Sequence, residues 1–267
     1  MLKRLLSKQN RALVSELVRT DFKLRYQGSV LGYIWSLLRP LLLFLILYVV
    51  FVKFLKVGNG IPNYPVYLLL GMILWNFFVE MTMQSLGSIV GRGDLIRKIK
   101  IPRWIIVISS SISAVINLLL NLVVLTIFMI FNHVHPTGLL TILPLIFFEL
   151  YLFSLGVSFF LATAFVRFRD INYVWEIILQ AGFYITPILY PLSRINNVFF
   201  QKLIILNPMS QIIQDARYVT VTKETTTNFA LFNGELYFLI PFILVILILF
   251  FSANYFRRKS KYFAEEI

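Results

Sequence analysis

The chain has 267 residues, of which 59% are hydrophobic and 14% are charged, and its formal net charge is +13. Soluble domains are nearer half apolar and a quarter charged, so this composition excludes a single water-soluble core and favours long membrane spans. There is no cysteine and there are only two histidines. These counts exclude a disulfide framework and a metal site built on thiolates or histidines.

The first thirty residues are not predicted to span a membrane. Leu13 and Leu17 fall on one helical face, whereas Arg11 and Arg19 fall roughly on the opposite face. Residues 1–30 are therefore predicted to form a cytoplasmic amphipathic helix at the membrane surface. Two interpretations stay open, a simple anchor and a basic collar that meets phosphate-bearing lipid.

Six hydrophobic segments follow, and each is close to the ~20 residues that a spanning helix needs. They cover residues 34–55, 64–83, 104–131, 139–166, 172–191 and 236–256. The fifth is interrupted by Glu176, Gln180 and Pro187 and is compatible with a broken or re-entrant element. The sequence thus predicts an all-α, polytopic membrane protein with one six-helix membrane domain, residues 31–267.

The cations are distributed unequally between the two predicted sides. Nineteen of the 25 Lys and Arg residues fall in the N-terminal segment, the second and fourth loops and the tail. Cytoplasmic loops carry the excess of basic residues, so both termini are predicted to be cytoplasmic in a bacterial inner membrane. This distribution explains the basic charge without a nucleic-acid partner.

Residues 191–235 form the one long loop predicted outside. It contains two short apolar runs, residues 198–200 and 203–206, and the dipeptide Asn207-Pro208 then breaks the chain. This pattern predicts two short helices that rest in the outer membrane interface before the last span.

The second cytoplasmic loop contains a basic stretch around Asp94–Lys100, which Pro102 ends. A short helix is predicted here. The charges alone fit the excess of cations on the cytoplasmic side, while a helix between two spans is also a suitable docking element for a cytosolic partner.

Polar residues inside the spans are informative because a charge facing lipid at the bilayer centre costs ~2–3 kcal/mol or more. They are expected to face protein or a wet cavity, either as hydrogen bonds between helices or as the lining of a path. Phe44 and Tyr48 share a face that fits lipid contact or a sugar path. The candidate path-lining residues are Phe44, Tyr48, Phe77, Glu80, Gln84, Tyr173, Glu176, Gln180 and Tyr184. A stripe of Ser110, Ser113, Asn117 and Asn121 on the third span favours contact between helices.

No catalytic residue is predicted. The sequence contains no GxxxxGK[ST] loop for nucleotide phosphates, and neither HExxH nor GxSxG occurs. Any ATP chemistry must therefore belong to another subunit, and no cofactor is expected in this chain.

Six segments in a fixed order make the chain recognisable. They are DFKLRYQGSVLGYIWSLLRP (Asp21–Pro40), LLLGMILWNFF (Leu68–Phe78), LIRKIKIPRW (Leu95–Trp104), VRFRDI (Val166–Ile171), ITPILYPL (Ile185–Leu192) and LNPM (Leu206–Met209). With them, the chain resembles the membrane subunits of ABC transporters that export teichoic acids, O-antigens and related capsular glycans.

The resemblance implies a homodimer that binds two cytosolic subunits, which hold ATP and Mg²⁺. An undecaprenyl-diphosphate-linked polymer would pass between the two copies, and residues 191–235 would supply gate helices. The ATPase would contact the surface helix around Arg19–Tyr26 and the loop between the second and third spans. In that loop the expected coupling residues are Arg97, Lys98, Lys100, Pro102 and Arg103.

A diphosphate at the inner interface would be attracted to nearby cations through charge-assisted hydrogen bonds. The expected entrance residues are Arg19, Lys23, Arg25, Tyr26 and Arg39. Wall teichoic acid is preferred over O-antigen or capsular polysaccharide as cargo. The alternatives are an ion-coupled transporter or flippase with Glu80, Glu149 and Glu176 as relays, and an integral-membrane enzyme acting on prenyl phosphates.

Overall fold

The computed structural model describes residues 8–25, 32, 34–58, 60–99, 101–134 and 138–266, and within these ranges it contains helices and turns but no strand. The α-helices are α2 (Lys8–Arg25), α3 (Ile34–Tyr48), α4 (Tyr64–Ser88), α5 (Gly93–Lys98), α6 (Trp104–Phe131), α7 (Leu143–Arg167), α8 (Ile171–Ile185), α9 (Val198–Ile205), α10 (Pro208–Thr220), α11 (Asn228–Leu231), α12 (Ile240–Lys259) and α13 (Phe263–Glu266). Short helical turns lie at η1 (Val49–Phe54), η2 (Val90–Arg92), η3 (Leu140–Ile142), η4 (Leu192–Arg194) and η5 (Leu236–Leu239).

Five helical segments of the described chain are long and apolar enough to cross a membrane. They are Ile34–Phe54, Tyr64–Ser88, Trp104–Phe131, Leu140–Arg167 and Leu236–Lys259. An all-α, polytopic membrane protein is thereby confirmed.

The remaining predicted span, residues 172–191, is shorter than predicted. It corresponds to α8, which has 15 residues and ends at Ile185. Thr186 is extended, as expected for a residue before proline, because the ring of Pro187 disfavours the helical conformation there.

The central helix of the bundle is α4, which packs against α3, α6, α7, α8 and α10. In the most apolar part of this span 78% of the residues are buried, as expected for a helix in the middle of a bundle. In the peripheral span formed by α3 and η1 only 6% of the residues are buried, and in the span that contains α12 only 17% are buried. Many apolar side chains of these outer helices therefore lie on the surface of the single chain.

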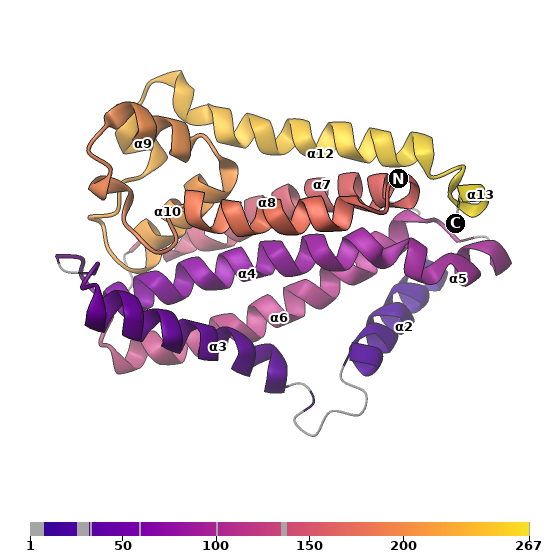
Figure 1. Cartoon of the computed structure of the whole chain (residues 1–267), viewed down its shortest axis with the longest axis horizontal. Coiled ribbons are helices and arrows are strands. Elements are labelled where there is room, and N and C mark those ends of the chain that lie inside the picture. Colours follow the sequence, from indigo (N-terminus) through magenta and orange to yellow (C-terminus); the bar gives the residue numbers. More distant parts are fainter. Residues whose placement is uncertain are drawn as a thin grey trace.

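The two ends of the bundle differ. Figure 1 shows α9 and α10 gathered at one end, and α5 and α13 at the other. We call these the α10 end and the α5 end. The connections from α4 to α6 and from α7 to α8 both lie at the α5 end, as does the end of α12. The loops predicted to be cytoplasmic therefore share one end.

Helix α10 is one of the two short helices that the sequence predicts before the last span. It is buried in the bundle, where it packs against α4, α7 and α12. Its first turn is capped by Asn207, whose side chain accepts a hydrogen bond from the Met209 amide at 3.1 Å. Polar side chains of α10, including Gln211, Gln214 and Arg217, are fully buried. By contrast, the neighbouring helix α9 exposes Val198, Phe199, Phe200 and Leu203 and buries Ile205.

The buried guanidinium of Arg217 joins three parts of the chain. It donates from Nε to the carbonyl oxygen of Tyr67 at 3.0 Å. It also donates from Nη1 to Pro187 at 2.6 Å and from Nη2 to Ile188 at 2.7 Å, again at carbonyl oxygens. Its Cζ lies 3.6 Å from the centroid of the Tyr67 ring, close enough for a cation–π interaction. Arg217 thus ties α10 to α4 and to the turn after α8.

A second polar contact joins α10 to α7. Gln211 Nε2 donates to Asp215 Oδ2 at 2.6 Å and lies 3.4 Å from Glu149 Oε2. Burial raises the pKa of Asp215 to about 6, although the hydrogen bond from Gln211 acts in the opposite direction. An ionised Asp215 is therefore unfavourable in the folded protein.

Gly71→Ala tests the packing around Arg217. A Cβ at position 71 would lie 3.1 Å from Arg217 Cζ and would overlap Nη2. We expect the substitution to destabilise the fold by about 1–3 kcal/mol, measured by thermal unfolding in detergent. The control is Gly87→Ala in the same helix, where an added Cβ meets no atom within 4 Å. Equal melting temperatures for the two variants would contradict this role.

Asp215→Asn tests the cost of the buried carboxylate. The folded-state pKa lies above the ordinary value of 3.8, so ionisation of Asp215 removes stability as the pH rises from about 4 to about 6. We expect the variant to melt at a higher temperature than the parent at pH 7.5, with a gain that shrinks at pH 5. The exposed residue Glu224 supplies the control variant, Glu224→Gln. A gain in melting temperature that is the same at pH 5 and pH 7.5 would contradict the role of Asp215 ionisation.

Candidate functional site

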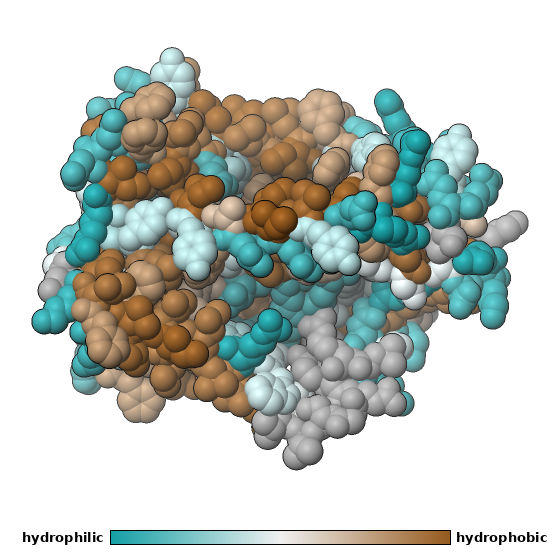
Figure 2. All heavy atoms as spheres, viewed as in Figure 1, coloured by the Kyte–Doolittle hydropathy of each residue, from teal (hydrophilic) through white to brown (hydrophobic). Residues whose placement is uncertain are grey.

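Four polar or aromatic side chains lie exposed along α8. They are Tyr173, Glu176, Gln180 and Tyr184, which share one side of the helix because they are spaced three or four residues apart. Each tyrosine is 68% exposed. We call these four residues the α8 polar face. Figure 2 shows pale and teal atoms along α8, between the brown surfaces of α3 and α12.

The α8 polar face is held in a defined geometry but is left open. Asn172 Nδ2 donates to Glu176 Oε1 at 2.9 Å, which orients the carboxylate. Beside the polar face, Ile177 and Ile178 are 66% and 49% exposed. A wide arc of α8 therefore lacks a covering element among the described residues. In a bilayer such a face needs protein or water against it.

The predicted pair of Glu80 and Gln84 lies on α4 and reaches α6. Glu80 Oε1 accepts from Gln84 Nε2 at 2.6 Å and from Asn117 Nδ2 at 2.5 Å. Asn121 Nδ2 then donates to the carbonyl oxygen of Asn117 at 2.8 Å. Glu80 and Gln84 are half-buried. They therefore join two helices and still keep part of their surface accessible.

The aromatic residues predicted to line a path are placed differently. Phe44 is 6% exposed and packs edge-on against Phe128, with ring centroids 5.5 Å apart. Phe77 is 3% exposed. These two rings are core residues of the single chain, so their prediction as lining is corrected. Tyr48 is half-buried, with its ring centroid 5.9 Å from that of Phe44.

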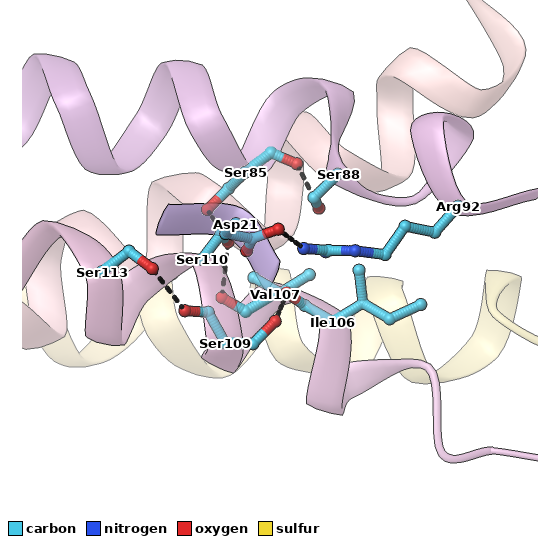
Figure 3. Close-up of polar contacts among 9 residues, drawn as sticks. All are labelled: Asp21, Ser85, Ser88, Arg92, Ile106, Val107, Ser109, Ser110 and Ser113. Carbon is cyan, nitrogen blue, oxygen red and sulfur yellow. Dashed lines mark hydrogen bonds and ion pairs between the residues drawn. The ribbon is translucent and has the colours of Figure 1, made fainter. Parts of the chain in front are cut away.

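The serines of α4 and α6 form contacts between and within helices. Ser85 Oγ lies 3.2 Å from Ser110 Oγ, across the two helices. Ser113 Oγ donates to the carbonyl oxygen of Ser109 at 3.4 Å. Ser110 and Ser113 are buried. Figure 3 shows this cluster, in which small side chains let α4 and α6 approach closely.

An ion pair beside the serines attaches α2 to the bundle. Arg92 of η2 donates to Asp21 of α2, and the pair lies next to the serine cluster in Figure 3. α2 also packs against α6. Leu13 and Leu17 are half-buried while Arg11 and Arg19 are exposed, which agrees with the predicted amphipathic pattern.

The short helix predicted between the second and third spans is present as α5. It presents Arg97 and Lys98 to solvent and buries Ile96. Pro102 is exposed and Arg103 is half-buried, whereas Lys100 lies outside the described residues. α13 packs against α5, and Phe263 of α13 is fully buried. The helix that carries Arg97 and Lys98 is therefore held in place by packing against α13 and by the buried side chain of Ile96.

The predicted entrance residues are distributed over two elements. Arg19 and Lys23 are exposed on α2, and Arg39 is exposed on α3. Arg25 belongs to α2, but its side chain lies outside the described part of the chain, as does Tyr26.

Sequence reasoning missed the polar residues buried at the α10 end. It assigned Arg217 to the outside cations, and it did not connect Glu149 with Gln211. Mixed polar and apolar residues in α10 resemble those of a solvent-exposed helix, so the sequence carried no signal that distinguishes the two environments.

Comparison with known proteins identifies the family. The model of the family described as ABC-2 type transporter matches residues 12–221. The O-antigen export system permease proteins RfbA of Myxococcus xanthus and Klebsiella pneumoniae are 30% and 32% identical over 202 residues, which cover 75% of this chain and 77% of each relative. Polysialic acid transport protein KpsM of Escherichia coli is 26% identical over 209 residues, which cover 76% of this chain and 79% of that protein. The chain therefore belongs to the ABC-2 type transporter family.

Proposed function

We propose that two copies of this chain form the membrane channel of an ATP-driven exporter, which moves a lipid-linked cell-surface glycan across the bacterial cytoplasmic membrane. The α8 polar face carries this proposal. It places carboxylate, amide and phenol groups on the outside of a membrane bundle, where lipid alone would leave them without hydrogen-bonding partners.

The named relatives support a polysaccharide as cargo. Two are described as O-antigen export permeases and one as a polysialic acid transport protein. The motifs of the sequence favour wall teichoic acid, and all these polymers share hydroxyl-rich repeating units. We propose that the cargo is such a polymer attached to undecaprenyl diphosphate.

The α8 polar face suits a sliding glycan. Sugar rings present apolar C–H faces that pack on the rings of Tyr173 and Tyr184, and their hydroxyls exchange hydrogen bonds with Glu176 and Gln180. The half-buried residues Glu80 and Gln84 add polar groups from α4. A path of this kind lowers the cost of moving a diphosphate headgroup through ~30 Å of hydrocarbon.

Pairing of two copies would complete the path. The exposed Ile177 and Ile178 supply apolar contact area beside the α8 polar face, and a cyclic dimer would bring the same two faces together. Polar groups would then line a seam between copies, away from lipid.

A separate cytosolic subunit supplies the energy in this proposal, since the sequence lacks a nucleotide-binding loop. The exposed cations Arg97 and Lys98 on α5 form its docking surface. Arg19, Lys23 and Arg39 attract the diphosphate at the same side of the membrane. Both termini are then cytoplasmic, which agrees with the basic α5 end.

Glu176→Leu tests the path. We expect export of the lipid-linked glycan by the reconstituted transporter to fall at least tenfold, with unchanged recovery of the ATPase-bound dimer. Ile177→Leu, on the same exposed arc, is the control and should export normally. Full export by Glu176→Leu would overturn the proposed path. Export that continues with a hydrolysis-deficient ATPase and stops when the proton gradient is dissipated would favour the ion-coupled alternative.

Reversal of charge at Arg97, Lys98 and Lys100 to glutamate tests the docking surface. We expect the triple variant to lose copurification with the ATPase while it remains a folded membrane protein, because the reversed charges repel an acidic partner surface. The matched control reverses the exposed Arg257, Arg258 and Lys259 at the end of α12. A triple α5 variant that still binds ATPase and exports glycan would show that docking occurs elsewhere.

A further inference from the structure

An apolar groove lies between α7, α8 and α12. Its volume is about 410 Å³, within the range of ~300–1,000 Å³ that is usual for small-molecule sites. Six of its seven lining residues are apolar or aromatic. The lining consists of Val157, Phe160, Trp175, Leu247, Ile248, Phe251 and Ser252. We call this the α7–α8–α12 groove.

Close packing behind the groove fixes its shape. A Cβ at Gly156 of α7 would lie 3.0 Å from the Cα of Leu249, so α7 and α12 approach closely at this point. On the α8 side, Trp175 Nε1 donates to Thr82 Oγ1 at 3.2 Å, and its ring packs against that of Phe78. The wall formed by Trp175 is therefore anchored to α4, and the groove is formed before any ligand binds.

The groove and the α8 polar face belong to the same helix. Trp175 lines the groove, while the next residue, Glu176, is part of the polar face. Successive helical residues point about 100° apart. An amphiphile that straddles α8 would therefore meet an apolar site on one side and a polar path on the other.

We propose that the α7–α8–α12 groove binds a segment of the hydrocarbon chain of the lipid-linked glycan while the headgroup and sugars follow the α8 polar face. This inference rests on the proposed function. The apolar hydrocarbon chain matches the lining of the groove, in which only Ser252 carries a polar side chain. It also keeps the chain in an apolar environment, since each exposed CH₂ would cost ~0.8 kcal/mol in a watery path.

Bulk lipid competes for the same groove, and tethering favours the substrate. Lipid tails are as apolar as the groove, so the hydrophobic effect does not discriminate between the two kinds of chain. A headgroup already held at α8 raises the effective concentration of its own chain beside Trp175. The occupant is thereby specified by its attachment to the headgroup.

Photo-crosslinking in the assembled transporter tests the inference. Benzoylphenylalanine replaces Phe251 in the groove or, as the control, the adjacent Phe250 outside it. The two side chains are similarly exposed, at 65% and 60%. The probe is a radiolabelled undecaprenyl-diphosphate-linked glycan in nanodiscs. We expect at least fivefold more label at position 251 than at position 250, and loss of that label with excess unlabelled probe.

A second variant, Ser252→Phe, fills the groove from α12. We expect it to lower probe crosslinking at a benzoylphenylalanine placed at Phe160 at least fivefold, with unchanged copurification of the ATPase. Equal labelling at positions 250 and 251, or crosslinks at 251 to phospholipid alone, would overturn the groove assignment. The proposed function would still stand in that case, provided that the parent transporter exports the lipid-linked glycan. A parent transporter that exports no lipid-linked glycan would overturn the proposed function itself.

Discussion

Arg217 holds the α10 end of the molecule together. Its guanidinium is removed from solvent and satisfied by three backbone carbonyls and one aromatic ring. Burial of a charge without such partners costs several kcal/mol, so the carbonyls of Pro187 and Ile188 have to be presented where the chain turns after α8. Arg217 therefore links the geometry of that turn to the burial of α10. It also explains the glycine at position 71, where a Cβ would overlap the guanidinium.

Polar contacts hold both ends of the bundle, and apolar packing holds its middle. At the α5 end, the ion pair of Asp21 with Arg92 and the serines of α4 and α6 join three helices. At the α10 end, Arg217 and Gln211 do the same for α4, α7 and α10. Helix α8 has fewer attachments, chiefly through Trp175 and the buried Leu179. The helix that carries the proposed path is therefore held by few buried side chains of its own chain.

The sequence predicted five of its six spans, the short basic helix and the spacing of the α8 polar face, because hydropathy, charge and helical period are local properties. It did not predict the burial of α10, since Gln211, Gln214 and Arg217 gain their partners only from distant segments. Phe44 and Phe77 were misplaced for a related reason. An apolar helix face has the same composition whether it meets lipid, a path or the core, and only packing against Phe128 decides for Phe44.

The shortness of α8 limits what this helix can line by itself. A helix of 15 residues is about 22 Å long, whereas the hydrocarbon layer is about 30 Å thick. Beyond Ile185 the chain turns, and the carbonyls of Pro187 and Ile188 accept hydrogen bonds from Arg217. A path along the α8 polar face would therefore have to be continued by residues of other elements.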